Sequence, residues 1–378
     1  MTAPHIDAQI NSLLESLAKS DLLERQIYLS EIASLGHEAI PAILDAADYA
    51  IAEIALREVI TGLNDEGRER ACTYLVRALR RDRDARVRLL ALTMLGDRLH
   101  DLTGFIDKTV EISVDGSESS ELRTRALRTL RAATLEREHV RDLAQLLDVG
   151  ILGSDCPAQF REAAFACLET HAAQLAVGAT MKQLDKFLIH PAPDVRVCAL
   201  NLLGEIGDID AIERMCMMPN TQAEIEQIQA AMGNILKRPT NLLSLRWEHF
   251  EHFVGHLLRK MGHMDVEVTR SVRDNGFDVV SYKQRDNLKG PVRERWVVQC
   301  KRWATNDVDL NDVEAMVQCS REQDAKHALL VTTSGFTKRA LEYEGQHGAA
   351  IELVSGVELL AILDTHFGPG RYAIQVRD

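Results

Sequence analysis

The sequence predicts two parts of different fold class, an N-terminal α-helical solenoid followed by an α/β domain with a mixed sheet. Residues 1–238 carry apolar residues at helical spacing almost throughout, and a similar pattern recurs along them. After residue 262, short runs alternate apolar and polar residues, as strands do, and helical runs lie between them. With 378 residues, 46% of them hydrophobic, the chain is long enough for two separate cores.

An internal repeat organises the first part. Val87–Gly96 aligns without gaps on Val195–Gly204, and two further copies start at Leu122 and Phe160. The starts are 35, 38 and 35 residues apart, and Ile51 extends the series 36 residues upstream. Such a period predicts stacked helix pairs, with a small residue where paired helices approach and leucines in a continuous core.

These repeats resemble the HEAT type over roughly residues 20–235, through Asp194-Val195-Arg196, Ala199-Leu200, Leu203-Gly204 and Gly207-Asp208. In that family an aspartate before the helix and an arginine within it often form a ladder between neighbouring repeats. The resemblance implies such a ladder for Asp84 with Arg88 and for Asp194 with Arg196, although the two copies between them depart from the pattern. A solenoid offers an extended surface for a protein, peptide or nucleic acid, and the fold does not select among these.

The most basic stretch of this part combines six arginines with two aspartates. Its arginines are Arg77, Arg80, Arg81, Arg83, Arg86 and Arg88, and its aspartates are Asp82 and Asp84. The local excess could contact phosphate, but a solvated face with salt bridges is the favoured interpretation.

A change of fold is predicted near residue 240. The repeat pattern stops at Lys237–Asn241, where Pro239 disfavours helix in the preceding residue. The predicted organisation is a repeat domain at 1–238, a linker at 239–246, an α/β domain at 247–366 and a tail at 367–378. The predicted helices of the α/β domain are 247–261, 310–323, 338–347 and 357–366, and its strands are 264–269, 276–282, 296–301, 328–333 and 351–354.

Two neighbouring strands carry a candidate site. Asp278 lies on one apolar run, and Gln299-Cys300-Lys301 ends the next. Because side chains alternate along a strand, Gln299 and Lys301 project to the same side, where a paired strand could bring Asp278 beside them. A carboxylate, an amide oxygen and an ammonium group suit a metal-dependent phosphodiester hydrolase.

The C-terminal domain resembles the Mrr-like restriction endonucleases of the PD-(D/E)XK nuclease superfamily, over about residues 243–366. The matching segments, in order, are Trp247–Glu251, Leu257–Gly262, Asp274–Asp278, Gln299–Trp303 and Val331–Thr337. The resemblance implies that Asp278 binds the metal and that Lys301 is the catalytic lysine. Gln299 stands where the wider superfamily has an acidic residue, and glutamine is frequent there in the Mrr-like group.

The resemblance further implies Mg²⁺ or Mn²⁺ as the cofactor. The expected ligands are Asp278, Gln299 and the backbone carbonyl of Cys300, with Glu251 orienting a metal-bound water or Lys301. The Cys300 side chain is expected to point to the opposite face, as a core thiol. Asp274 is explained adequately by a turn with Asn275 and Gly276.

A strand running into a helix is a second candidate site, for DNA. Thr333, Ser334 and Thr337 lie at this junction, followed by Lys338, and Arg302 follows the catalytic lysine. Helix N-termini bind anions, so a contact with a DNA phosphate is expected here, with helix capping as the default alternative. His249, His252 and His256 on the first helix are read as a solvated or partly buried helix face, because no further metal ligand accompanies them.

Composition excludes few functions. The formal charge of −13 is uneven: residues 241–378 carry 18 Lys and Arg against 20 Asp and Glu, which leaves 26 against 37 for residues 1–240. The seven cysteines form no CxxC pair, so neither a zinc site nor a disulfide scaffold is indicated. No apolar stretch predicts a membrane span and no signal peptide is recognised, so a cytoplasmic protein is expected.

The sequence therefore predicts a metal-dependent DNA endonuclease of restriction or genome defence, whose repeats recognise DNA or a protein partner. A homodimer is expected, because cutting two strands with a single-site domain usually calls for two copies. Two alternatives stay open: an inactive module that binds or targets nucleic acid, and an interaction scaffold centred on the solenoid.

Overall fold

The computed structural model describes residues 3–218, 221–269, 276–287, 290–347 and 350–374. The turn predicted at Asp274 and Asn275 lies outside these residues. The chain divides into two compact units, Met1–Gln183 and Leu184–Asp378. The predicted change of fold near residue 240 lies inside the second unit, because the last repeat helices pack against the first helix of the α/β domain. No helix among the described residues is both long and apolar enough to span a bilayer.

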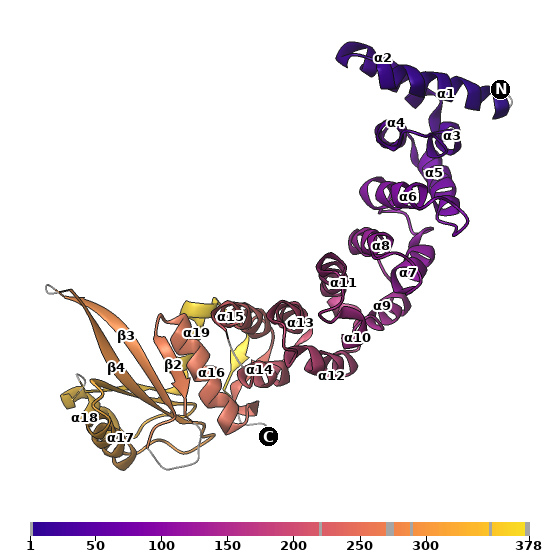
Figure 1. Ribbon diagram of the computed structural model, residues 1–378. Helices are drawn as coiled ribbons and strands as arrows, with labels where there is room; N and C mark the ends of the chain where they lie inside the picture. Colours follow the sequence, from indigo (N-terminus) through magenta and orange to yellow (C-terminus); the bar gives the residue numbers. More distant parts are fainter. Residues whose placement is uncertain (1–2, 219–220, 270–275, 288–289, 348–349, 375–378) are drawn as a thin grey trace. The chain divides into compact units, whose positions relative to one another are not determined.

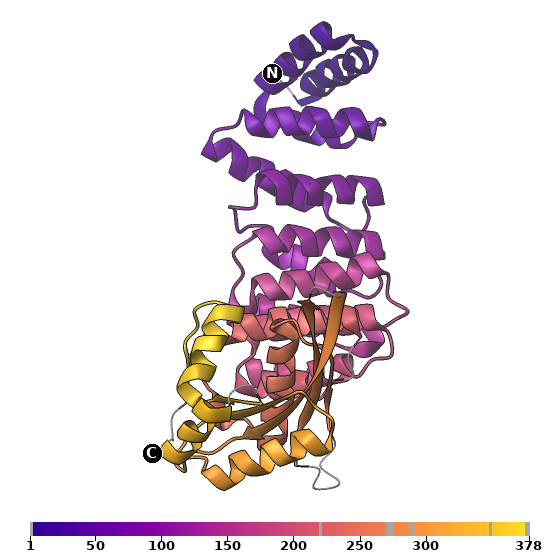
Figure 2. The ribbon, with the colours of Figure 1, turned by 90° about the vertical axis from the view of Figure 1, so that its left-hand side faces the viewer.

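The first unit is built from helices, as predicted (Figure 1). In chain order they are α1 (Ala3–Lys19), α2 (Leu22–Ser34), η1 (Gly36–Ala39), α3 (Ile40–Leu44), α4 (Tyr49–Thr61), α5 (Asp65–Ala78), α6 (Ala85–Arg98), α7 (Ile106–Val114), α8 (Ser120–Ala132), α9 (Arg137–Ala144), α10 (Val149–Leu152), α11 (Ala158–Thr170) and η2 (Ala172–Gln174). Helix α12 (Val177–Leu188) crosses into the second unit. Helices α2, α4, α6, α8 and α11 contact one another in series, and Figure 2 shows such helices, indigo to magenta, stacked side by side.

Small residues let these helices approach closely. Ala91, Ala126 and Ala164 occupy equivalent positions of successive repeats and are fully buried. At Gly96, an added Cβ would lie 2.8 Å from the Thr129 hydroxyl oxygen, so a larger residue would push α6 and α8 apart. Thr129 in turn donates from Oγ1 to the Leu92 carbonyl at 2.9 Å. The predicted helical repeats are thus confirmed, with their small residues at the helix contacts.

The arginine that recurs at the second repeat position ties each helix to the backbone before it. Arg88 donates to the Leu79 carbonyl at 3.2 Å, and Arg123 donates to the Ser113 carbonyl at 3.0 Å. Arg161 donates in the same way to Gly153 at 2.9 Å. Each contact satisfies a carbonyl near the end of the preceding helix or loop, so this arginine fixes the turn within a repeat.

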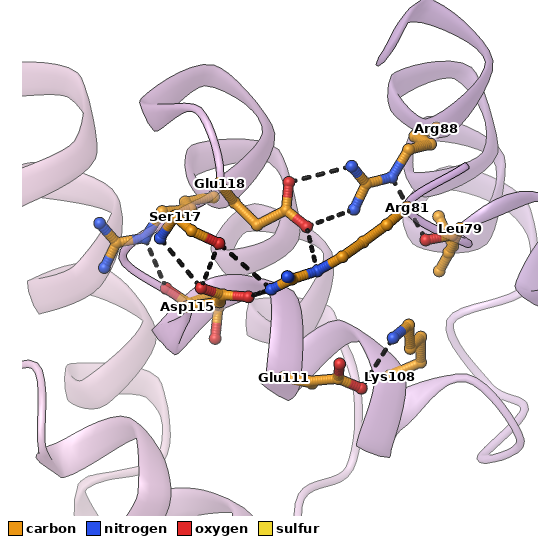
Figure 3. Close-up of polar contacts among 10 residues, drawn as sticks. Leu79, Arg81, Arg88, Lys108, Glu111, Asp115, Ser117 and Glu118 are labelled. Carbon is orange, nitrogen blue, oxygen red and sulfur yellow. Dashed lines mark hydrogen bonds and ion pairs between the residues drawn. The ribbon is translucent and has the colours of Figure 1, made fainter. Parts of the chain in front are cut away.

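The ladder between repeats uses an acid that the sequence did not point to. Both guanidinium nitrogens of Arg88 donate to the Glu118 carboxylate, at 2.6 and 2.9 Å (Figure 3). Arg81 also binds Glu118 and its neighbour Asp115. Asp84, expected in the ladder with Arg88, instead caps α6 by accepting from the Arg86 N–H at 2.8 Å. Since the acid lies 30 residues after Arg88, no local pattern reveals the pairing.

The salt-bridged interpretation of the basic stretch is confirmed for most of its arginines. Arg80 pairs with Asp82 and Arg83 with Asp45, in addition to the pairs of Arg81 and Arg88. Arg86 lies over the Tyr49 ring at 5.5 Å.

The second unit joins the last repeat helices to an α/β domain. Its helices are α13 (Pro193–Ile206), α14 (Ile209–Cys216), α15 (Gln222–Leu236), η3 (Leu242–Ser244), α16 (Trp247–Lys260), α17 (Leu310–Glu322), α18 (Lys338–His347) and α19 (Gly356–Phe367). Its strands are β1 (Thr240–Asn241), β2 (Met264–Val268), β3 (Val279–Asn287), β4 (Gly290–Lys301), β5 (His327–Thr332), β6 (Ile351–Val354) and β7 (Tyr372–Ala373).

A five-stranded mixed sheet in the order β2-β3-β4-β5-β6 forms the centre of the domain. Strands β2, β3 and β4 are antiparallel neighbours, whereas β4, β5 and β6 are parallel. Helices α17 and α18 pack on one face around Val297, Leu330 and Met316, and α16 and α19 contact the sheet as well (Figure 1). The predicted mixed sheet flanked by helices is confirmed.

The β3–β4 hairpin is longer than the sequence predicted. Pairing continues from Val279 opposite Val298 to Asn287 opposite Gly290, whereas β2 pairs with β3 only as far as Tyr282 and β5 pairs with β4 only from Trp296 onward. Within the part of the chain that the structure describes, the outer part is a two-stranded ribbon with no strand paired to either of its edges. Because neither of its faces is buried by the sheet core, its sequence lacks the apolar alternation that marks the other strands.

The segments predicted as linker and tail pair with each other. Strand β1 in the linker runs parallel to β7 in the tail, with Thr240 opposite Tyr372. The Thr240 N–H donates to the Arg371 carbonyl at 3.1 Å, and the Arg371 N–H donates to the Leu236 carbonyl at 3.0 Å. The C-terminal segment therefore anchors the connection between α15 and α16.

Candidate active site

Asp278 lies directly before β3, at the end of the sheet where β4 also ends. Its backbone N–H donates to the Val298 carbonyl at 2.8 Å, beside the pair that Val298 forms with Val279 at the start of β3. The Cys300 N–H donates to the Asp278 Oδ2 atom at 2.7 Å. One carboxylate oxygen is thereby fixed to the backbone of β4, which leaves the other to face a ligand.

Lys301 ends β4 and points toward α17. Its Nζ donates to Asp312 Oδ1 at 3.0 Å and lies 5.1 Å from the centre of the Trp303 ring. Its positive charge also lowers the pKa of Asp278, so the two groups interact electrostatically. The sequence reasoning missed Asp312, which lies eleven residues from Lys301 on the next helix. Only the tertiary packing of α17 on β4 reveals it.

Burial raises the pKa of the Asp278 carboxyl, against the lowering effects of the Cys300 N–H and of Lys301. Desolvation disfavours the charged form of a carboxyl group, and a bound cation would compensate for the lost water.

Glu251 is a buried carboxylate on α16, with 8% of its surface exposed. Burial raises the pKa of Glu251 to about 8, and the negative charges of Asp278 and Glu248 add to this effect. No hydrogen bond to the Glu251 carboxylate is found among the described residues. The fold thus brings Glu251 within electrostatic reach of Asp278, as a buried acid that holds a proton near neutral pH.

Cys300 alternates with Gln299 and Lys301 along β4. Because Lys301 reaches α17, the alternation directs the Cys300 side chain to the other face, and the residue as a whole is half-buried. Burial raises the pKa of the Cys300 thiol well above its usual value, and the Asp278 and Glu251 charges raise it further. The thiol is therefore protonated and unreactive at neutral pH.

The donor set fits a hard divalent cation. It combines the Asp278 carboxylate, whose burial favours a compensating charge, with amide and backbone oxygens, and Mg²⁺ and Mn²⁺ prefer oxygen ligands. No group of three or more His, Cys, Asp or Glu side chains with metal-binding spacing occurs in the described ranges. A site made from Asp278, Gln299 and the Cys300 carbonyl would contain only one side-chain ligand of those types, the Asp278 carboxylate.

The residues expected to contact DNA differ in their surroundings. Thr333 is buried and its hydroxyl donates to the Trp303 carbonyl at 2.8 Å. The Ser334 and Thr332 hydroxyls share a hydrogen bond of 2.9 Å, and Arg302 donates to the Leu243 carbonyl at 3.0 Å. These contacts stabilise the sheet end and its connection to η3.

Thr337 is half-buried, like Ser334, whereas Lys338 is exposed. The Thr337 carbonyl accepts the first hydrogen bond of α18, from the Leu341 N–H at 3.1 Å. The Lys338 side chain is 91% exposed, with Glu342 at 3.7 Å. Of the predicted DNA contacts, Lys338 is thus the most available to an incoming phosphate.

Two of the three histidines of α16, His249 and His256, have clearly different surroundings. His249 faces Glu213 at 3.1 Å, and His256 is buried, which lowers the pKa of its ring to about 3. Their surroundings agree with a helix face packed against neighbouring elements.

Comparison with known families identifies the second part of the chain. Residues 242–363 match the model of the restriction endonuclease family Mrr_cat. These residues form an Mrr-type restriction endonuclease domain. The match covers α16 and every strand of the mixed sheet, and it includes Asp278, Gln299 and Lys301. The predicted resemblance is thereby confirmed.

One similar curated protein is the Type IV methyl-directed restriction enzyme EcoKMrr of Escherichia coli (strain K12). It is 30% identical over 127 residues, which are 32% of this chain and 40% of the relative. The chain therefore spans less than half the length of the curated relative that it matches.

Two solved structures resemble parts of the chain. The DNA modification-dependent restriction endonuclease AspBHI is 20% identical with a TM-score of 0.27, over 31% of this chain and 30% of that one. A designed armadillo repeat protein is also 20% identical with a TM-score of 0.32, over 52% of this chain and 100% of that one.

Proposed function

We propose that this protein is a metal-dependent endonuclease that hydrolyses DNA phosphodiester bonds in restriction or genome defence. The observation that supports the proposal most is the hydrogen bond to the Asp278 carboxylate from the Cys300 N–H, which lies between Gln299 and Lys301 on β4, within an Mrr-type domain. A carboxylate, an amide and an ammonium group at the ends of neighbouring strands suit hydrolysis of a phosphodiester.

In this proposal each residue has a separate task. Asp278 and Gln299 hold a Mg²⁺ or Mn²⁺ ion, together with the Cys300 carbonyl. When bound, the ion polarises the phosphate and lowers the pKa of a coordinated water. Lys301 stabilises the negative charge that develops on the phosphate oxygens, and Asp312 holds its ammonium group in place. Glu251 accepts or releases a proton beside the ion.

The DNA that is cut and the assembly that cuts it are further parts of the proposal. The curated relative is named as methyl-directed, so methylated DNA is the first substrate to test. The Thr333–Lys338 segment and Arg302 are proposed to lie near the DNA, with Lys338 making the direct contact. The HEAT-like repeats recognise DNA or a protein partner, and a homodimer supplies one site for each strand.

The test is a nicking assay on supercoiled plasmid, methylated or unmethylated, with Mg²⁺ or with chelator. We expect the wild type to nick with Mg²⁺ only, and Asp278→Ala and Lys301→Ala to lose the activity. Equal nicking by all three proteins would exclude the proposed site. If the wild type cuts none of the substrates, a binding module or an interaction scaffold becomes the better description.

A further inference from the structure

A hollow of about 610 Å³ lies within the first unit, between α6, α8 and α11. Its floor is one face of α8, where Glu121, Thr124, Arg125 and Arg128 follow one another at helical spacing. Leu89 of α6 and Gln159 at the start of α11 form part of its walls. We call it the α8 hollow.

The two arginines of the α8 hollow differ from those arginines of this unit that are bound to acids. Arg57, Arg68 and Arg83 each bind an aspartate of another helix or loop, at 2.5 to 2.7 Å. By contrast, in the ranges that the structure describes, Arg125 and Arg128 form no ion pair and no hydrogen bond. Glu121 is the single carboxylate among the lining residues, so the hollow keeps a net positive charge.

The start of α11 adds to this positive potential. Its N-cap position is held by Pro157, which has no side chain able to accept from the first N–H groups of the helix. Pro157 and Gln159 line the hollow, opposite the arginines of α8. The partial positive charge of a helix start therefore acts on the same space as two guanidinium groups, which is a favourable environment for an anion.

We propose that the α8 hollow binds the phosphate backbone of DNA, through Arg125 and Arg128. The proposal rests on DNA being the substrate of the endonuclease domain. Guanidinium groups bind phosphate oxygens through two parallel hydrogen bonds, and such contacts are independent of base sequence. An acidic peptide fits less well, because peptide docking depends on buried apolar anchors and Leu89 is the main apolar side chain that the hollow presents.

The proposal places the phosphate contacts of the repeats one repeat later than the basic stretch of residues 77–88. In that stretch, acidic partners already neutralise Arg80, Arg81, Arg83 and Arg88. An arginine without an acidic partner can bind a phosphate without first breaking an ion pair. Phosphate contacts are therefore better located from the ion pairs of the folded protein than from the number of arginines in a stretch of sequence.

The experiment measures binding of a fluorescent DNA duplex by anisotropy, in chelator, over a series of salt concentrations. All proteins carry Lys301→Ala so that no cleavage occurs. The test variant adds Arg125→Gln and Arg128→Gln, and the control adds Arg137→Gln and Arg141→Gln on α9, which changes the net charge equally. Circular dichroism and thermal melting confirm that each variant is folded.

We expect about tenfold weaker binding for the test variant, and a slope of log affinity against log salt that is smaller by about 2. The control should bind like its parent. Unchanged affinity of the test variant, or an equal loss in the control, would overturn the proposal. So would a parent that binds an acidic peptide through Arg125 and Arg128 but binds no DNA.

Failure of the endonuclease proposal gives a different pattern from failure of this one. A wild type that cuts no DNA with Mg²⁺, yet binds duplex through these two arginines, contradicts the active site and supports the α8 hollow. A wild type that cuts DNA with Mg²⁺, but whose DNA binding does not depend on Arg125 and Arg128, supports the active site and contradicts the α8 hollow.

Discussion

Lys301 and Asp312 form an ion pair at the end of the sheet where β4 ends, with 3.0 Å between Nζ and Oδ1. Their side chains are only 20% and 26% exposed, so water screens the pair less than it screens a surface salt bridge. The contact joins the end of β4 to the first turn of α17. It therefore holds the proposed catalytic ammonium group in place before any substrate arrives.

Replacing Asp312 should slow DNA cleavage without removing the cation. Asp312→Asn weakens a hydrogen bond between two charged groups, so the Lys301 ammonium becomes less well placed. We expect kcat to fall about tenfold, equivalent to roughly 1.4 kcal/mol, with little change in KM. Single-turnover cleavage measures this. Glu314→Gln removes an exposed charge from the same helix and should leave the rate unchanged; an equal loss in both variants would show a general effect of charge.

Glu251 should make the metal-free protein less stable as pH rises. Its pKa is about 8 in the fold, above the ordinary value of 4.5, so the folded state binds the proton more tightly than the unfolded state. The stabilising contribution is complete below pH 4.5, declines as pH rises, and is lost above about pH 8. Glutamine cannot ionise, so Glu251→Gln should be more stable than the wild type by about 1–3 kcal/mol at pH 8.5, with a much smaller difference at pH 4.5.

Thermal melts in chelator at both pH values test this expectation. Glu267→Gln is the matched control, because Glu267 is an exposed residue of β2. If Glu251→Gln is less stable than the wild type at pH 8.5, the raised pKa of the buried Glu251 carboxyl is contradicted.

The Arg88–Glu118 rung should be important for the stability of the repeats. Both side chains are at most 10% exposed. Removing one partner of a buried pair leaves the other charge without compensation, so Glu118→Ala should cost about 3 kcal/mol of unfolding free energy. Asp45→Ala breaks the exposed pair with Arg83 and should cost less than about 1 kcal/mol. Urea denaturation followed by circular dichroism measures the unfolding free energy of both variants. Equal losses would mean that the Arg88–Glu118 pair stabilises the fold no more than an exposed salt bridge does.

The Glu118 rung should also weaken in acid. The hydrogen bonds from Arg88 lower the pKa of the Glu118 carboxyl below its ordinary value of 4.5. Its contribution is therefore complete above that value and is lost as pH falls through the lowered pKa. Wild type and Glu118→Gln should thus differ less in stability at pH 3 than at pH 7, as urea denaturation at both pH values can show. A difference that grows in acid would contradict this.

The sequence predicted those features that depend on local pattern. Buried helix faces and central strands leave a period in the apolar residues, so the repeats and the order of elements from α16 to α19 could be recognised. The pairing of the two strands that carry Asp278 and Cys300 followed from the hairpin and from a resemblance carried by several segments.

Features without a local pattern could not be predicted. The outer β3–β4 ribbon has no buried face, and β1 and β7 have two residues each. Partners distant in the chain, such as Asp312 for Lys301 or Glu118 for Arg88, depend on how helices pack. The Arg125 and Arg128 pair was not singled out either, because only the fold shows that both line one hollow and have no acidic partner among the described residues.

The most direct test of the proposed site asks whether Asp278 binds the cation and Lys301 serves only the cleavage step. Titration calorimetry with Mn²⁺ and single-turnover cleavage of plasmid DNA are measured on the wild type, Asp278→Asn and Lys301→Ala. We expect Asp278→Asn to lose both cation binding and cleavage, and Lys301→Ala to bind Mn²⁺ while cleaving at least about 100-fold more slowly. Normal cation binding by Asp278→Asn, or cleavage by Lys301→Ala at the wild-type rate, would contradict the account.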